Sequence, residues 1–167
     1  DRRTAVTPLP GAYSADGRPW AVVQADLAAQ LISHGVPAAA VERILWLYGA
    51  RAGQLLAMGA PWLEPLAPGV PAVKGEVRLA IEQEMASTLL DFLDRRSSLL
   101  LFSDDQGAAA AAPAAELMAQ LLGWSDAHRR QQLASYEAAA VRCRPALGPA
   151  TVADAAAADG RGQPPRP

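Results

Sequence analysis

The sequence predicts an all-α fold, with about six helices in a compact orthogonal or bundle-like domain. Apolar residues recur at intervals of three and four along most of the chain, which is the spacing of one face of an α-helix. No segment alternates apolar and polar residues as a half-buried strand does. Of the 167 residues 51% are hydrophobic and 19% are charged, so the chain has apolar surface for a core and is not a charge-rich disordered protein.

Each predicted helix has an apolar face and a Gly, Pro or capping residue at one end. Residues 59–71 contain six Gly and Pro residues between helices and predict a loop, which Trp62, Leu63 and Leu66 are expected to hold against the core. In chain order, the predicted helices are the one before Gly35, the one from Pro37 to Gly49, Arg51–Met58, Gly75–Arg96, the alanine-rich one before Gly123, and the one that Ser125 caps.

The segment Gly75–Arg96 carries the strongest helical pattern in the chain. Acidic residues fill its first half and Arg95 and Arg96 end it, which complements the helix dipole, and Asp91 and Arg95 are spaced as an i, i+4 ion pair. The pattern predicts one continuous helix. Its apolar positions step by 4, 4, 4 and 3 residues and form the expected core stripe: Val77, Ile81, Met85, Leu89 and Phe92.

The distribution of breakers divides the chain into three parts. Residues 1–20 contain three prolines and two glycines and predict an extended arm or linker. Residues 21–144 form the helical domain. Residues 145–167 consist mostly of Ala, Gly, Pro, Asp and Arg, which bury too little apolar surface to become ordered, and predict a disordered tail. Because the chain begins with Asp1 and not Met, it is interpreted as a piece of a longer protein.

Several classes of function are excluded by composition and motifs. A pI of about 5.7 disfavours a nucleic-acid-binding surface. One cysteine allows no intrachain disulfide, and two distant histidines do not make a zinc site. The sequence contains no run of about 20 apolar residues, which a membrane-spanning helix requires. No glycine-rich phosphate loop is present, so we expect no catalytic, cofactor-binding or metal-binding residue in this chain.

Isolated reactive residues have simpler structural interpretations. Cys143 lies between two arginines that favour its thiolate, but an incidental thiol is the simpler interpretation. His34 is placed at a helix end, where a cation suits the dipole, and His128 is expected to be solvated. Four carboxylates are interpreted as the polar face of a helix and not as a catalytic pair: Glu82, Glu84, Asp91 and Asp94. Four tryptophans are interpreted as core or domain-interface residues and not as a ligand-stacking site: Trp20, Trp46, Trp62 and Trp124.

Arg95 and Arg96 keep two interpretations. They either complement the end of a helix dipole or anchor this domain to acids or backbone carbonyls of a neighbouring domain, which the fork of a guanidinium group fits. They are the candidate interdomain contact of the chain.

One segment resembles a known family. Gly75–Ala86 reads Gly-Glu-Val-Arg-Leu-Ala-Ile-Glu-Gln-Glu-Met-Ala, and Thr88–Ser97 reads Thr-Leu-Leu-Asp-Phe-Leu-Asp-Arg-Arg-Ser. This pattern is similar to the C-terminal domain of FAD-dependent glycerol-3-phosphate dehydrogenases, although Ser97 stands where that family commonly has Thr. Shorter matches over about residues 5–142 support the resemblance: Leu9-Pro10-Gly11, Leu47-Tyr48-Gly49, Leu117-Met118-Ala119, Gly123-Trp124-Ser125 and Tyr136-Glu137.

The resemblance implies a role outside the catalytic centre. The family enzyme oxidises sn-glycerol 3-phosphate to dihydroxyacetone phosphate, flavin takes the hydride, and electrons pass to a quinone, or to dioxygen in related oxidases. The FAD and substrate residues belong to a preceding domain. The resemblance therefore implies that this chain is an accessory domain that braces the flavin domain, binds no flavin itself and is inactive alone. It further implies loose association of the full-length enzyme with the cytoplasmic face of an inner membrane and leaves a homo-oligomer open.

One rival function is a free-standing helical interaction or regulatory module that binds a partner helix. Another is an oxidase that reduces dioxygen and produces hydrogen peroxide. The length of the native polypeptide separates the module from the dehydrogenase domain, and peroxide production separates the oxidase from the dehydrogenase.

Overall fold

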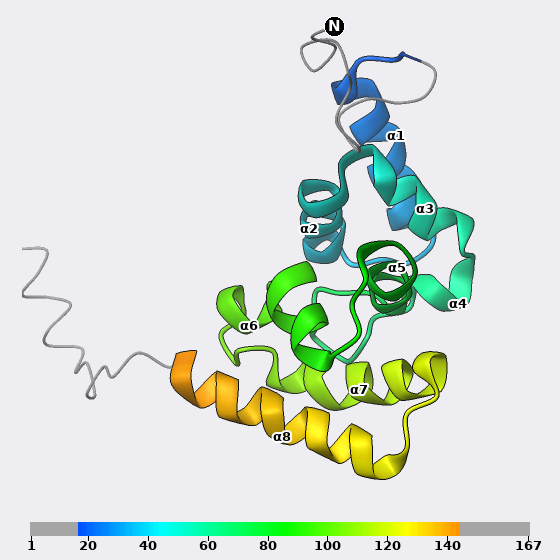
Figure 1. The fold of residues 1–167 in the computed structure, drawn as a ribbon. Helices are drawn as coiled ribbons and strands as arrows, with labels where there is room; N and C mark the ends of the chain where they lie inside the picture. Colours follow the sequence, from blue (N-terminus) through cyan, green and yellow to red (C-terminus); the bar gives the residue numbers. More distant parts are fainter. Residues whose placement is uncertain (1–16, 144–167) are drawn as a thin grey trace, which may run out of the picture.

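A computed structural model of the chain describes residues 17–143, and this part of the protein is all-α (Figure 1). The predicted fold class is confirmed. Most of the predicted arm and the whole predicted tail from residue 145 lie outside the described residues. The helices are α1 (Trp20–Ser33), α2 (Ala38–Tyr48), α3 (Ala52–Ala57), α4 (Ala60–Leu63), α5 (Lys74–Glu84), α6 (Leu99–Phe102), α7 (Ala108–Leu122) and α8 (Asp126–Cys143), with a 3-10 turn η1 (Gly49–Arg51) and a π-helix η2 (Asp91–Arg96).

The predicted helices account for most of the fold. Five of the six predicted segments form α1, α2, α3, α7 and α8. Ser125 caps α8 as predicted, because the backbone N–H of His128 donates to its Oγ at 3.2 Å. The predicted loop 59–71 contains the additional short helix α4, and Leu63 and Leu66 are buried in the core as expected. The short helix α6 was not predicted, since four residues carry no readable period.

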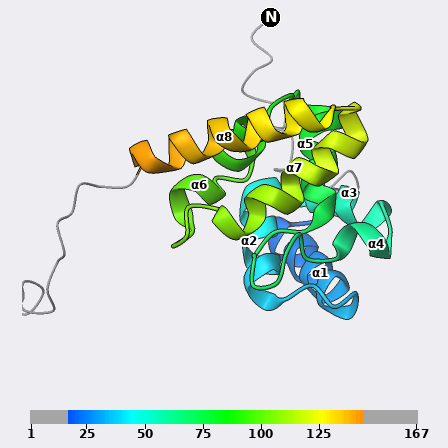
Figure 2. The same ribbon diagram turned by 90° about the horizontal axis from the view of Figure 1, so that it is seen from below.

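The described residues form two hydrophobic clusters that meet at α5. The first cluster gathers buried residues of α1–α4, and the second gathers those of η2, α6, α7 and α8. Helix α5 contributes Leu79 to the first cluster and Val77 and Ala80 to the second. Figure 1 shows α5 between the upper helices α1–α3 and the lower pair α7 and α8, which Figure 2 shows side by side from below. A helix buried on two sides is the structural centre of the fold.

The start of α5 packs against backbone and not only against side chains. A Cβ atom on Gly75 would lie 3.0 Å from the carbonyl oxygen of Trp62 and 3.1 Å from Leu55 Cδ2. Glycine at this position therefore allows α3 and α4 to approach the first turn of α5 closely.

The prediction of one helix over Gly75–Arg96 is wrong. Helix α5 ends at Glu84, and Met85 adopts the left-handed conformation with φ +56°. The backbone N–H of Ala86 donates to the carbonyl of Ala80 at 2.9 Å, which closes the end of the helix. Met85, a predicted core residue, is 85% exposed.

A reciprocal cap begins the next helical segment. Asp91 Oδ2 accepts hydrogen bonds from the backbone N–H groups of Ser87 at 3.1 Å and Thr88 at 2.9 Å, and the backbone N–H of Asp91 donates to Thr88 Oγ1 at 3.1 Å. This is the arrangement of a capping box. The helical segment that leads into η2 therefore has its own start after Thr88, separated from α5 by the break at Met85.

Candidate functional site

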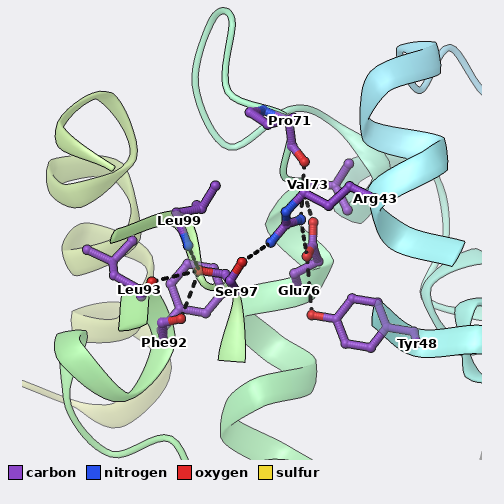
Figure 3. Close-up of polar contacts among 9 residues, drawn as sticks. All are labelled: Arg43, Tyr48, Pro71, Val73, Glu76, Phe92, Leu93, Ser97 and Leu99. Atoms are coloured by element: carbon purple, nitrogen blue, oxygen red, sulfur yellow. Dashed lines mark hydrogen bonds and ion pairs between the residues drawn. The ribbon is translucent and has the colours of Figure 1, made fainter. Parts of the chain in front are cut away.

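The polar centre of the fold is an ion pair between α2 and α5 (Figure 3). Glu76, in the first turn of α5, is 0% exposed. Its Oε2 accepts a hydrogen bond from Arg43 Nη1 at 2.7 Å, and its Oε1 accepts one from the backbone N–H of Val73 at 2.9 Å. A buried carboxylate is tolerated when its oxygens are matched by donors in this way.

Arg43 connects three segments that are distant in the sequence. Besides Glu76, its guanidinium donates to the carbonyl of Pro71 at 3.1 Å and to the carbonyl of Ser97 at 2.7 Å. Figure 3 shows the guanidinium between these three partners. Helix α2, the segment before α5 and the residue after η2 are thereby fixed to each other. We call Arg43, Tyr48 and Glu76, with these two carbonyls, the Arg43–Glu76 cluster.

Tyr48 completes the cluster from the end of α2. Its hydroxyl donates to Glu76 Oε2 at 3.2 Å. Burial, followed by the negative charge of Glu76, raises the pKa of Tyr48 far above its ordinary value. The phenol therefore stays protonated and acts as a hydrogen-bond donor. Both carboxylate oxygens of Glu76 are engaged, so the geometry supports a structural role and not proton transfer.

The sequence analysis missed this cluster. Glu76 was interpreted only as a charge that suits the helix dipole, and Arg43 was not singled out. A signal was present: Arg43 interrupts an otherwise apolar face of the predicted second helix, and a charged residue on such a face needs a partner. The partner could not be named, because it lies 33 residues away.

Arg95 and Arg96 differ in their surroundings. The side chain of Arg95 is 69% exposed and pairs with Asp91, which confirms the predicted i, i+4 pair. Arg96 is half-buried, and its Nε atom is buried with no hydrogen-bond partner among residues 17–143. Their role as an interdomain contact stays a prediction.

Three of the four candidate carboxylates are engaged in ion pairs. Partial burial acts to raise the pKa of Asp91, but hydrogen bonds from Thr88, Ser87 and Arg95 outweigh it and hold the pKa below its ordinary value. The polar-face interpretation fits these contacts. Three of the four pair with arginines: Glu82 with Arg78, Glu84 with Arg51, and Asp91 with Arg95.

The histidines and the cysteine lie apart from the Arg43–Glu76 cluster. His34 is exposed, with Nδ1 2.8 Å from the carbonyl oxygen of Gln30. His128 lies edge-on against Trp124, with ring centroids 5.1 Å apart, and is solvated only in part. Cys143 is exposed at the end of α8. Within residues 17–143 no three His, Cys, Asp or Glu residues are grouped to hold a metal ion, and no helix is long and apolar enough to cross a membrane.

A groove lies beside the Arg43–Glu76 cluster, on the outer side of α2. It has a volume of about 550 Å³ and is lined by residues of α2 and α6, two helices that lie on the same side of the molecule in Figure 1. Trp46, 76% exposed, and Phe102, 80% exposed, stand at its edge. Trp46 is therefore not a core residue, and its alternative interpretation as a domain-interface residue stays a prediction, whereas Trp20, Trp62 and Trp124 are partly buried. We call this the α2–α6 groove; it is lined by Ala39, Glu42, Arg43, Trp46, Leu47, Pro71, Ser97–Leu99, Phe102 and Ser103.

Comparison with known protein families identifies the family of this chain. Residues 2–129 match the family model described as the C-terminal domain of alpha-glycerophosphate oxidase. The chain belongs to this family. The match covers most of the chain and includes α1 to α7 and the start of α8, so the fold described above is that of an alpha-glycerophosphate oxidase C-terminal domain.

Two curated relatives agree with this family. A glycerol-3-phosphate dehydrogenase of Synechocystis sp. is 35% identical over 99 residues, which are 58% of this chain and 18% of that protein. A glycerol-3-phosphate dehydrogenase of Mycobacterium leprae is 31% identical over 136 residues, which are 80% of this chain and 23% of that protein. The matched regions thus span about a fifth of the length of these relatives. No solved structure matches the chain.

Proposed function

We propose that this chain is the C-terminal accessory domain of an FAD-dependent glycerol-3-phosphate dehydrogenase, and that it braces the flavin domain. The observation that carries the proposal is the family match over residues 2–129, together with two relatives named as this dehydrogenase. The full-length enzyme would oxidise sn-glycerol 3-phosphate to dihydroxyacetone phosphate and pass electrons to a quinone. The FAD, when bound, accepts the hydride from the substrate.

The lining of the α2–α6 groove supports this division of roles, because it does not suit a flavin diphosphate. Arg43, which lines the α2–α6 groove, donates to Glu76, Pro71 and Ser97. The same groove carries the carboxylate of Glu42 at its rim, which would repel a diphosphate. We therefore assign FAD and substrate binding to the preceding domain of the polypeptide, and bracing to this one.

The brace depends on rigidity, and the Arg43–Glu76 cluster supports it. The cluster joins the two hydrophobic clusters through α2, α5 and the residue after η2. A domain that holds its shape can fix the surface that it presents to a neighbour, whereas a loosely joined pair of subdomains would not. A free-standing interaction module is disfavoured by the family match.

The test compares the full-length polypeptide with the present chain. The full-length protein should purify yellow and oxidise glycerol 3-phosphate with a soluble quinone analogue as acceptor. The present chain should be colourless and inactive. Flavin retained by the present chain would contradict the assignment of FAD to the preceding domain, and a full-length protein inactive with glycerol 3-phosphate would contradict the dehydrogenase.

A second acceptor is favoured by one finding: the matched family model is named for an oxidase. Dioxygen as acceptor would produce hydrogen peroxide, and a quinone would not. Peroxide formed in proportion to the glycerol 3-phosphate consumed, in air and without added quinone, would assign the oxidase activity in place of the dehydrogenase.

The location and assembly of the full-length enzyme follow from the same proposal. We expect peripheral association with the cytoplasmic face of the inner membrane, through surfaces that lie mostly in the preceding domain. Cell fractionation should find the enzyme in the membrane fraction and release it with salt or mild detergent. Sedimentation analysis of the released enzyme would distinguish a monomer from a homo-oligomer.

Arg95 and Arg96 remain the proposed interdomain contact within this function. In the full-length enzyme, Arg95→Ala combined with Arg96→Ala should weaken attachment of this domain to the flavin domain and leave its own helices folded. Two thermal transitions in place of one would be the expected result of calorimetry. Unchanged thermal stability and activity would remove these residues from the contact.

A further inference from the structure

The α2–α6 groove combines large exposed apolar side chains with a concave surface. Trp46 and Phe102 are 76% and 80% exposed, and Leu101, next to Phe102, is 58% exposed. Exposed aromatic residues at a groove are typical of the anchor positions of protein interfaces. Exposed apolar residues scattered singly need no such explanation.

The apolar surface continues beyond this groove on the other side of Phe102. A second groove of about 410 Å³ shares Pro71, Leu99, Phe102 and Ser103 with the first. It lies between residues 68–71 and the start of α7. Phe102 therefore stands between two hollows, and a partner that covers it would contact both.

The backbone holds this aromatic side chain outward. Ser98, directly before α6, adopts the left-handed conformation with φ +55°. Ser97 fixes the turn, because its Oγ donates to the carbonyl of Phe92 at 2.8 Å and its own carbonyl accepts from Arg43 at 2.7 Å. The Arg43–Glu76 cluster thus lies under the surface that carries Phe102, and its contact with Ser97 fixes the start of α6.

The rim of the two grooves is acidic. Glu42 lines the first groove and Asp104 lines the second. Both side chains are exposed, and no ion pair to either is present within residues 17–143. Asp105, also at the second groove, accepts from the backbone N–H groups of Gly107 and Ala109 at the start of α7. The complementary surface is an apolar segment flanked by Lys or Arg.

We propose that the α2–α6 groove and the adjoining groove are the docking surface for the preceding domain of the same polypeptide, which inserts apolar side chains flanked by basic ones around Phe102. This inference rests on the proposed function and assigns the brace to a particular face. The matched family is a C-terminal domain, and the matched regions are 18% and 23% of the lengths of the curated relatives. Most of such a polypeptide therefore precedes this domain and is available to cover the face.

The experiment places a photo-crosslinker on the proposed face of the full-length enzyme. Phe102 is replaced by p-benzoylphenylalanine, the enzyme is irradiated, and crosslinked peptides are identified by mass spectrometry. The matched control carries the same replacement at Leu121, which is 39% exposed at the C-terminal end of α7, the end that Figure 1 places away from α6. Copies labelled with light and heavy nitrogen are mixed, so that crosslinks within and between copies are distinguished.

The expected result is a crosslink from position 102, and not from position 121, to peptides of the preceding domain within one copy. Crosslinks between light and heavy copies would overturn the proposal in favour of a second copy of the chain. Crosslinks to residues 1–16 or 144–167, or no crosslink above the control, would overturn it as well.

A second measurement tests the energetic role of the same face. In the full-length enzyme, Trp46→Ser combined with Phe102→Ser should raise the rate of protease cleavage between the two domains about tenfold, because loss of an aromatic anchor costs at least that factor in a docking equilibrium. Leu121→Ser should leave the rate unchanged. An unchanged rate in the double variant would overturn the proposal.

The outcomes separate this inference from the proposed function. An active, yellow enzyme without the crosslink removes the docking face and leaves the dehydrogenase. A crosslinked protein that does not oxidise glycerol 3-phosphate removes the proposed activity and leaves the docking face.

Discussion

Arg43 and Trp46, two residues one turn apart on helix α2, have opposite surroundings. Arg43, a cation, turns inward to the fully buried Glu76, whereas Trp46, one turn further along, is 76% exposed. A helix that only served a core would have the reverse pattern. The hydrogen bonds of Arg43 hold three segments together. The side chain of Trp46, in contrast, is apolar surface that this domain does not bury. Arg43 thus stabilises the fold, whereas Trp46 is exposed on the surface of the fold.

The largest expected effect is on the inward side. Arg43→Ala leaves Glu76 buried and without its cation, and we expect a loss of about 3–5 kcal/mol in the free energy of unfolding. Urea unfolding of the present chain measures it. Arg78→Ala breaks an exposed pair with Glu82 and is the matched control, with an expected loss of about 0.5 kcal/mol. Equal losses in the free energy of unfolding would show that the buried Arg43–Glu76 pair stabilises the fold no more than an exposed ion pair does.

The hydroxyl of Tyr48 is a smaller part of the same cluster. Tyr48→Phe removes the hydrogen bond to Glu76 and keeps the ring in the first hydrophobic cluster. We expect a loss of about 1 kcal/mol, since Arg43 still satisfies the carboxylate. A stabilised variant would show that desolvation of the buried hydroxyl costs more free energy than its hydrogen bond to Glu76 contributes.

The cap of η2 adds a pH dependence of comparable size. The pKa of Asp91 is lowered in the folded state, so its contribution is fully present above its unfolded pKa of about 3.9 and is lost as the pH falls through the folded value. Asp91→Asn should cost about 1 kcal/mol at pH 7, and the difference from wild type should shrink below about pH 4. Unfolding at pH 7 and pH 3 checks this. A difference as large at pH 3 as at pH 7 would contradict the assignment.

The smallest effect is expected on the outward side. In the present chain, Trp46→Ser removes an exposed side chain and should change the free energy of unfolding by less than about 0.5 kcal/mol. The same substitution should destabilise the full-length enzyme. If Trp46→Ser destabilises the isolated chain as much as Arg43→Ala does, the contrast between Trp46 and Arg43 is lost.

The sequence predicted the helices that depend on local period and missed the features that depend on distant partners. The spacing of Val77, Ile81, Met85 and Leu89 continues across the break at Met85, so period alone predicted one helix. The Thr88-x-x-Asp91 pattern was a readable sign of a new helix start. The pairing of Arg43 with Glu76 across 33 residues has no local signal beyond a charge on an apolar face. The exposure of Trp46 likewise depends on which neighbours the fold supplies.

The contact from Arg43 to Ser97 joins residues 54 positions apart in the sequence, and it affects how the molecule unfolds. A state in which only α1–α4 remained folded would retain Arg43 and lose both Glu76 and the Ser97 carbonyl. Such half-open states are costly, because they lose the hydrogen bonds of Arg43 to Glu76 and Ser97 and uncover the apolar side chains that pack against Leu79 of α5. Amide hydrogen exchange in α2 and η2 should consequently proceed through one shared opening event, and a peptide ending before α5 should not fold by itself.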